Sequence, residues 1–506
     1  MTLSDLSTLD RAICGEIWAS DAAARTLERL CQECNGRFAG SDDYRRAAEM
    51  VAGWWREIGL SDVRLERFPF TAWERGRASL SLTAPAARAY PCLALPYAPA
   101  CDLEAEALDL GFGLEADVNR AGDAIRGKIA LVKNGGPAGG RPEHRLQKYA
   151  RVKAAGAAAF LFVDDQPGML PPTGSLVFIQ DGPLDQALPS AGIPFEAGQD
   201  LARWAKTGAP LRLRLRLENR LWRAESWNVV GELNRTHPEP VEGQLGASAG
   251  SATVESSAPA STHPEPVEGQ PGAPTRPDGQ SATGDAPAFV VSGHLDGHDI
   301  AQGAIDNASG IVAMTEIARS LAPIRTQLQH DIRFIAFGAE ELGMLGSYAY
   351  VGQHLAELDA LRFVFNLDCV GTGNRVGFGL QDCGELAPVF REMAAALATD
   401  LDVGEYLVPF SDQFPFTVQG IPSAFIHTSG DKGPRGWGHT AADTLDKVSV
   451  QAIRLAAAAV ARMIARVATD ASPWPGRRRT PDEVKATLQA QGTEPLLRAE
   501  EQWPFK

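Results

Sequence analysis

The chain has 506 residues, of which 44% are hydrophobic and 22% charged, so it is long enough for two or more globular domains. Its 63 acidic and 48 basic residues give a net charge of 48 − 63 = −15, which argues against binding to nucleic-acid phosphates or anionic membranes. No run of about 18 apolar residues is present, which argues against a membrane span. The N-terminus shows no signal-peptide pattern and the seven cysteines are sparse, so we expect a reducing, cytoplasmic location.

The first elements along the chain are two helices followed by strands. Residues 20–35 and 44–58 are predicted to be helical, because apolar side chains recur there every three or four residues. Alternation of hydrophobic residues over 63–70 and again over 80–82 then predicts strands.

Residues 105–218 differ from the preceding segment in the length of their predicted elements and in composition. Short apolar strands over 128–132 and 158–163 flank a predicted helix over 144–155, and Gly and Pro are frequent in the connections. We interpret this stretch as a small, β-rich domain inserted into a larger one.

Residues 236–285 contain a repeat. The nonapeptide Thr-His-Pro-Glu-Pro-Val-Glu-Gly-Gln occurs at 236–244 and again at 262–270, with mostly Ser, Ala and Gly between the copies. Such a composition cannot bury a core, so we expect a disordered loop. The loop separates apolar strands over 228–233 and 288–293, which we expect to pair as neighbours. We therefore interpret the repeat as an insertion into a hairpin, with no role in chemistry.

From residue 288 onward strands and helices alternate, which is typical of an α/β sheet. The predicted elements are a helix over 307–321, strands over 331–337 and 361–367, a helix over 386–398, a strand over 423–427 and a helix over 450–468. The fold class is therefore α/β, with a mixed, mostly parallel sheet between helices. Residues 1–104 and 219–470 would form this discontinuous main domain, and residues 471–506 a peripheral tail with one short helix.

Histidines and acidic residues stand at the ends of several predicted elements. They are His294, Asp296, Asp306, Glu340, Glu341, Asp368, Asp412 and His439. Each alone has a structural explanation; Asp306, for example, could cap the helix that follows it. Together they would meet in one crevice, because the carboxyl ends of parallel strands share an edge of the sheet. So many like charges need a cation, and imidazole and carboxylate ligands favour zinc, manganese or cobalt.

The order of these motifs resembles the co-catalytic zinc aminopeptidase and carboxypeptidase Q superfamily. His294-Leu295-Asp296 is followed twelve residues later by Asp-Asn-Ala-Ser-Gly, and then by Glu-Glu, Asn-Leu-Asp and His-Thr in that order. Upstream, the segments at 37–41 and 73–76 resemble parts of the carboxypeptidase Q branch. The inserted stretch resembles the protease-associated (PA) domain that many members carry. The resemblance implies the zinc-exopeptidase fold.

The same resemblance implies two Zn²⁺ ions per chain, with Co²⁺ or Mn²⁺ as alternatives. Asp306 would bridge both ions. His294 and Asp368 would complete one metal site, and Glu341 and His439 would complete the other.

Other roles are also carried over from the resemblance. Glu340 would be the general base, and Asp296 would orient the first histidine ligand. A cis peptide bond would follow Asp306. Gln413 stands where several relatives carry His or Tyr, and its amide would help to stabilise the tetrahedral intermediate. His298 is interpreted as a lining or structural residue rather than a ligand.

The implied activity is hydrolysis of small peptides by an exopeptidase or dipeptidase, and a homodimer would fit the resemblance. Two alternatives stay open. A zinc acyltransferase of the glutaminyl cyclase type would need one metal, and such relatives lack the insert. A receptor-like relative would be non-catalytic, although here the ligand positions and Glu340 are intact. The sequence leaves open which peptide terminus is recognised; we expect specificity in loops near 375–384 and 405–437 and in the inserted domain.

Overall fold

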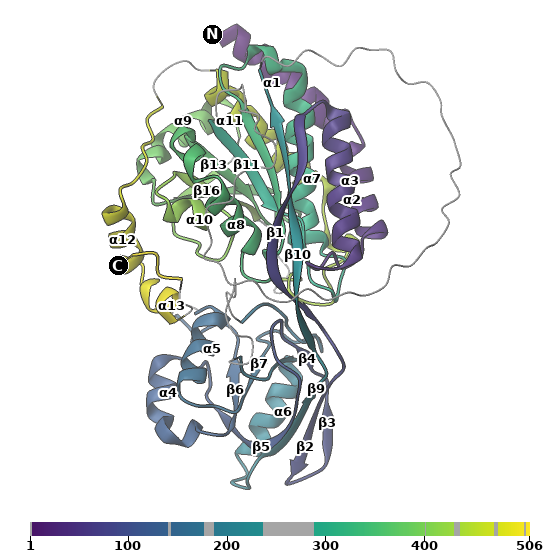
Figure 1. Cartoon of the computed structure of the whole chain (residues 1–506), viewed down its shortest axis with the longest axis vertical. Coiled ribbons are helices and arrows are strands. Elements are labelled where there is room, and N and C mark those ends of the chain that lie inside the picture. Colours follow the sequence, from purple (N-terminus) through teal and green to yellow (C-terminus); the bar gives the residue numbers. More distant parts are fainter. Residues whose placement is uncertain are drawn as a thin grey trace, which may run out of the picture.

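The protein folds into two lobes joined by a pair of long strands (Figure 1). The computed structural model describes residues 3–139, 143–176, 187–235, 288–399, 401–429, 436–469, 474–499 and 502–505. The predicted disordered loop, 236–285, lies outside these residues.

The larger lobe is built on an eight-stranded mixed sheet of order β1-β10-β12-β11-β13-β16-β14-β15. The strands are β1 (Ser61–Glu74), β10 (Arg220–Leu233), β11 (Phe289–His294), β12 (Ile332–Phe337), β13 (Phe363–Leu367), β14 (Arg375–Gln381), β15 (Leu401–Glu405) and β16 (Ser423–Ser429). The central strands β12, β11, β13 and β16 run parallel. Strands β11, β12 and β13 are buried throughout, as expected for strands covered on both faces. The α/β class is confirmed.

Helices cover both faces of this sheet. One face carries α1 (Leu3–Trp18), α2 (Ala22–Glu33), α3 (Asp42–Ile58), α7 (Ser309–Leu321), α9 (Ala387–Ala396) and α11 (Val450–Thr469). The other face packs against α8 (Leu345–Gln353) and α10 (Phe414–Val418) through Tyr350 and Phe416. The predicted helices in this lobe are confirmed, whereas α1, α8 and α10 were not predicted.

The prediction that residues 228–233 and 288–293 pair as neighbours is wrong. Strand β12 lies between β10 and β11, antiparallel to the first and parallel to the second. Helix α7 makes the crossover from β11 to β12, which allows β12 to lie on the side of β11 that faces β10. The pattern of two apolar strands could not show that a later strand would take the place between them.

The smaller lobe contains a second eight-stranded sheet of order β3-β2-β9-β5-β6-β7-β8-β4. Its strands are β2 (Ala78–Ala84), β3 (Arg88–Tyr90), β4 (Leu93–Ala94), β5 (Cys101–Asp109), β6 (Ile129–Lys133), β7 (Ala159–Val163), β8 (Ser190–Ile193) and β9 (Arg212–Leu217). Helices α4 (Glu115–Ala121), α5 (Arg145–Ala154) and α6 (Phe195–Ala205) complete it. This sheet starts well before residue 105, because β2 and β5 pair with β9 rather than with the larger sheet.

The C-terminal segment has two helices, α12 (Pro481–Ala490) and α13 (Glu494–Ala499), where one was predicted. It is also not peripheral. Leu488 is buried in a hydrophobic cluster with Leu146 of the smaller lobe and Met344 of the larger one. Burial of each such side chain stabilises the structure by roughly 1.5–3 kcal/mol, so this segment ties the two lobes together (Figure 1).

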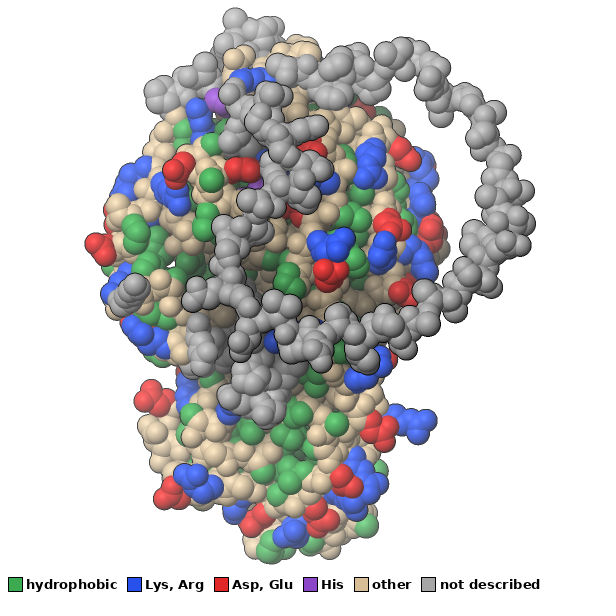
Figure 2. Space-filling model, in the orientation of Figure 1, with side chains coloured by type: hydrophobic (Ala, Val, Ile, Leu, Met, Phe, Trp, Pro, Cys, Tyr) green, Lys and Arg blue, Asp and Glu red, His purple; other side chains and the backbone are tan. Residues whose placement is uncertain are grey.

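On the face shown in Figure 2, described Lys and Arg side chains lie among Asp and Glu side chains over both lobes. They do not gather into one basic surface there, as expected for a protein with net charge −15. Among the described residues, no helix is both long enough and apolar enough to cross a bilayer.

Candidate metal centre

The predicted site residues gather at one edge of the larger sheet, where the parallel strands end. Two groups of ligating side chains lie there, and within each group the ligating atoms are within 4.8 Å of one another. The first group is His294, Asp306 and Asp368, and the second is His298, Glu341 and His439. The fold thus brings all five predicted metal ligands into two adjacent groups, together with one histidine that was not predicted as a ligand.

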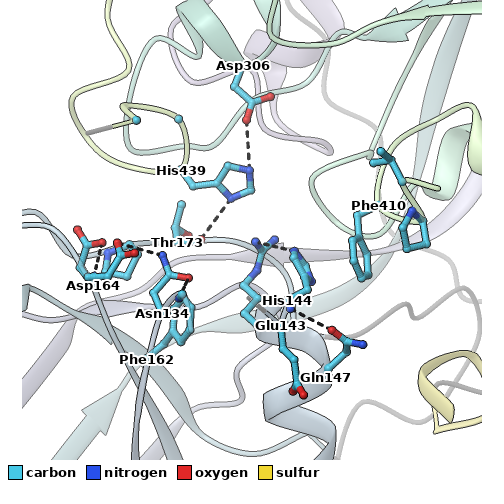
Figure 3. Close-up of a pocket in the computed structure, with 18 of the residues that line it drawn as sticks. Asn134, Glu143, His144, Gln147, Phe162, Asp164, Thr173, Asp306, Phe410 and His439 are labelled. Atoms are coloured by element: carbon cyan, nitrogen blue, oxygen red, sulfur yellow. Dashed lines mark hydrogen bonds and ion pairs between the residues drawn. The ribbon is translucent and has the colours of Figure 1, made fainter. Parts of the chain in front are cut away.

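Asp306 lies between the two groups. Its Oδ1 is 3.2 Å from Nε2 of His294, and its Oδ2 is 3.2 Å from Nε2 of His439, as Figure 3 shows for the second contact. Asp306 does not cap α7, which begins at Ser309. The peptide bond between Asp306 and Asn307 is cis, as the resemblance implied. One oxygen therefore faces each group, which is the arrangement that a carboxylate bridging two ions requires.

His298 belongs to the second group. Its Nε2 lies 2.8 Å from Oε2 of Glu341 and 3.4 Å from Nδ1 of His439, and the residue is only 4% exposed. Its ring is therefore placed among the ligating atoms of the second group, and the interpretation of His298 as a lining or structural residue stays a prediction. The sequence signal available was a second histidine four residues after His294.

Asp296 positions the two glutamates rather than the histidine ring. Its Oδ1 accepts a hydrogen bond from the backbone N–H of Glu340 and its Oδ2 one from that of Glu341, each at 3.1 Å. Nδ1 of His294 is 3.1 Å from the backbone oxygen of Asp296 but 3.8 Å from its carboxylate. The predicted orienting role thus falls to the main chain, and the carboxylate holds the turn that carries Glu340 and Glu341.

The electrostatics of the site favour a bound cation. Burial raises the pKa of Glu340 well above its usual range and that of Glu341 to about 7, with further upward shifts from neighbouring carboxylates. Oε1 of Glu341 and Nδ1 of His298 are buried without a hydrogen-bond partner among the described residues. Unpaired buried polar atoms of this kind are costly. The donor set of three carboxylates and three imidazoles therefore fits divalent metal ions.

Gln413 does not have the predicted role. Its Oε1 accepts a hydrogen bond from Nδ2 of Asn366 at 3.0 Å, and its Nε2 donates to the carbonyl oxygen of Val408 at 2.9 Å. The side chain is fully buried, and its amide supports the neighbouring loop instead of pointing toward the cleft. Ser411, two residues earlier, contacts a ligating group directly: its Oγ donates to Oδ2 of Asp368 at 2.7 Å.

Two further residues, not assigned from the sequence, hold the Asp306 loop. The carboxylate of Asp443 accepts hydrogen bonds from the backbone N–H groups of Ile305 at 2.7 Å and of Asp306 at 3.0 Å. The buried guanidinium of Arg37 donates to the carbonyl oxygens of Leu295, Gln302 and Gly303. Asp443 follows the His-Thr motif closely and could have been suspected. No local pattern links Arg37 to carbonyls so distant in the sequence.

We expect Asp443→Asn to weaken metal binding by roughly 10–100-fold. An asparagine side chain has only one oxygen, so it can accept only one of the two backbone hydrogen bonds that the carboxylate accepts. Titration of metal-free protein with Zn²⁺ measures this directly. Asp446→Asn is the matched control, since that carboxylate is 68% exposed and lies only three residues away. Equal zinc affinities for the two variants would contradict a positioning role for Asp443.

A cleft between the lobes leads to the site. It has a volume of about 940 Å³ and continues into an inner pocket of about 120 Å³ lined by His294, Asp306 and Asp368. Residues 407–410 and 436–440 contribute to the cleft, as expected for the 405–437 region, together with α5 and the C-terminal segment (Figure 3). The prediction of a lining loop at 375–384 is wrong for most of that stretch, because 375–381 forms the buried strand β14.

Comparisons with known proteins agree with this geometry. Residues 277–464 match the model of peptidase family M28, and residues 89–201 match that of the PA domain. Aminopeptidase YwaD of Bacillus subtilis is 26% identical over 450 residues, covering 86% of this chain and 82% of that protein. Human carboxypeptidase Q is 24% identical, covering 81% and 80%.

Solved structures share the fold. A peptidase M28 precursor from Shewanella amazonensis superposes with a TM-score of 0.71 at 20% identity, covering 94% of this chain and all of that one. BSAP, a zinc aminopeptidase from Bacillus subtilis, does so with a TM-score of 0.62 at 24% identity, covering 90% and 96%.

The fold and the two groups of ligating side chains define the class of this protein, a peptidase with two candidate metal sites. The family matches then specify it further. The chain matches peptidase family M28 in its larger lobe and the PA domain in its smaller lobe.

Proposed function

We propose that the protein is a di-zinc exopeptidase that hydrolyses the terminal peptide bond of small peptides, with Glu340 as the general base. The observation that carries the proposal is the position of Asp306, one oxygen of which faces each of the two ligating groups. Glu340 lines the same inner pocket, so a base and two ion sites converge on one small space.

The donor chemistry supports zinc. Each ligating group combines carboxylate oxygen with imidazole nitrogen, and neither group contains a thiol. This set suits zinc, cobalt or manganese in catalytic sites. We assign His294 and Asp368 to one ion and Glu341 and His439 to the other, with Asp306 shared.

When bound, two such ions would supply a water of lowered pKa and would polarise the scissile carbonyl. The residues of the chain provide the remainder of the reaction. Glu340 is held at the pocket through its backbone N–H, and burial raises the pKa of its carboxyl well above the usual range. A carboxylate with a raised pKa accepts a proton from the attacking water and then passes it to the leaving amine.

Two other functions are less well supported. A glutaminyl cyclase-type acyltransferase would need one ion, whereas this site offers two groups of ligands and the chain carries a PA domain. A non-catalytic relative would have no need for an intact Glu340 beside complete ligand groups. The cytoplasmic location and the homodimer stay predictions.

The test of this function is a count of bound metal, made alongside assays on free and N-blocked dipeptides. About two zinc-type ions per chain are expected, with hydrolysis lost on chelation and restored by zinc. Survival of the N-blocked peptides would show that the free amine is recognised. A single ion with cyclase activity would favour the acyltransferase, and a metal-free protein without hydrolysis would favour the non-catalytic relative.

A further inference from the structure

One arginine from the smaller lobe reaches the candidate metal centre. Arg145 is the first residue of α5 and lines both the cleft and the inner pocket that contains Glu340 and Glu341. It is the only Lys or Arg side chain among the described residues that line either cavity. Among the described residues of the inner pocket, the larger lobe thus supplies the acids, and the PA domain supplies the arginine.

The guanidinium is held in place by one backbone carbonyl and by a neighbouring histidine ring. Its Nε donates to the carbonyl oxygen of Ser175 at 2.9 Å, and its Nη1 lies 3.3 Å from Nε2 of His144. The guanidinium of Arg145 packs directly against the backbone of Gly174. Any larger residue would clash there, since a Cβ at position 174 would lie 2.2 Å from Cζ of Arg145. The ring of His144 stacks on Phe410 across the cleft, with ring centroids 3.8 Å apart (Figure 3). These contacts fix the end of α5 against the larger lobe.

The charge of Arg145 has no ion-pair partner among the described residues. The carboxylates of Glu341, Glu340 and Asp306 act on it electrostatically, and they partly offset the lowering of its pKa by burial. In the proposed reaction two of these carboxylates, Glu341 and Asp306, would be occupied by metal ions. The arginine would then remain as a fixed cation facing the pocket, and a bidentate donor of this kind matches a carboxylate.

We propose that Arg145 binds the terminal carboxylate of the substrate, so that the enzyme prefers peptides whose scissile bond precedes a free C-terminal residue, dipeptides above all. This rests on the proposed peptidase function and adds to it the terminus that is recognised. In a peptide, the scissile carbonyl carbon and the next carbonyl carbon are roughly 3–4 Å apart. A cation beside the reacting centre therefore meets a carboxylate only when the next residue is the last one; in a longer peptide it meets a neutral amide.

The test compares alanyl-alanine with its C-terminal amide, using the full-length, zinc-loaded protein. The two peptides share the same scissile bond and free amine and differ only in terminal charge. We expect the wild type to favour the free acid by roughly 10–100-fold in kcat/KM, mainly through a lower KM. This is the size of effect expected because the amide peptide cannot form the charge-assisted hydrogen bonds between its terminus and the arginine. Equal hydrolysis of the two peptides would overturn the proposal while leaving the peptidase function intact. Failure to cleave either peptide would instead refute the proposed function on which it rests.

Variants then assign the preference to the residue. Arg145→Gln should lower kcat/KM for the acid roughly 10–100-fold and leave the amide unchanged, and Arg145→Lys should retain part of the preference. Arg120→Gln is the control, because that arginine lies in the same lobe with a side chain 74% exposed and does not line the cleft. An equal loss on acid and amide in Arg145→Gln would overturn the proposal, since it would indicate a structural or oxyanion-stabilising role.

Discussion

Glu340→Gln is expected to abolish most of the activity while leaving both ion sites filled. The substitution keeps the shape of the side chain and removes its capacity to take a proton. General-base catalysis contributes roughly 10²–10⁴-fold, so kcat should fall by about that factor. The side chain lines the inner pocket but belongs to neither ligating group, so the metal content should be unchanged. Steady-state kinetics together with a count of bound zinc test both halves of this expectation.

The adjacent residue gives the sharpest comparison. Glu341→Gln alters a ligating side chain, so it should lose one ion as well as activity. Glu49→Gln, in an exposed helix-surface pair on α3, should match the wild type in both measurements. If Glu340→Gln keeps the wild-type kcat, the proton is carried by another group and the proposed mechanism is wrong.

Asp306→Asn is expected to have the second large effect, through loss of metal rather than loss of a base. Its two carboxylate oxygens each lie 3.2 Å from a histidine nitrogen, one in each ligating group. An amide offers one oxygen ligand and no charge, so one ion loses a ligand and both ions lose the negative charge that they would share. Bound zinc should fall from about two ions toward none, and activity should fall with it.

Thermal unfolding provides a measurement independent of catalysis. A ligand that binds the folded state alone raises the midpoint of unfolding, so zinc should stabilise the metal-free wild type far more than the Asp306→Asn variant. Asp402→Asn, an exposed carboxylate on β15, serves as the control. Retention of two ions by Asp306→Asn would show that Asp306 does not bridge the sites.

The smaller lobe and the C-terminal segment complete the cleft. The proposed metal ligands all come from the larger lobe, but Arg145 and Thr173 from the smaller lobe contact or line the space in front of them. Nδ1 of His439 lies 3.3 Å from the carbonyl oxygen of Thr173, and the backbone N–H of Thr173 donates to the carbonyl of His439 (Figure 3). The proposed second metal site is therefore supported across the boundary between the lobes.

Much of the fold and of the site could be predicted from local sequence. The α/β class was indicated by apolar strands that alternate with helices along the chain. Such strands can be recognised because a strand buried on both faces is apolar along its whole length. The helices at 44–58 and 450–468 follow from spacing of apolar residues, which reflects a single buried face. The five proposed ligands could be grouped because parallel strands end at the same edge, whatever the order of those strands in the sheet.

The sequence by itself thus indicated which side chains meet, because most of them follow a strand or precede a helix, and the family resemblance of the motifs indicated the chemistry that they share with His439, which lies in a loop. Only the tertiary structure decided the rest. The place of β12 between β10 and β11, the two backbone groups held by Asp296, and the burial of Gln413 all depend on contacts between distant segments. The same is true of Arg145, which the packing of one lobe on the other carries to the centre. Such contacts leave no periodic pattern, because they are fixed by how finished elements pack rather than by how each element forms.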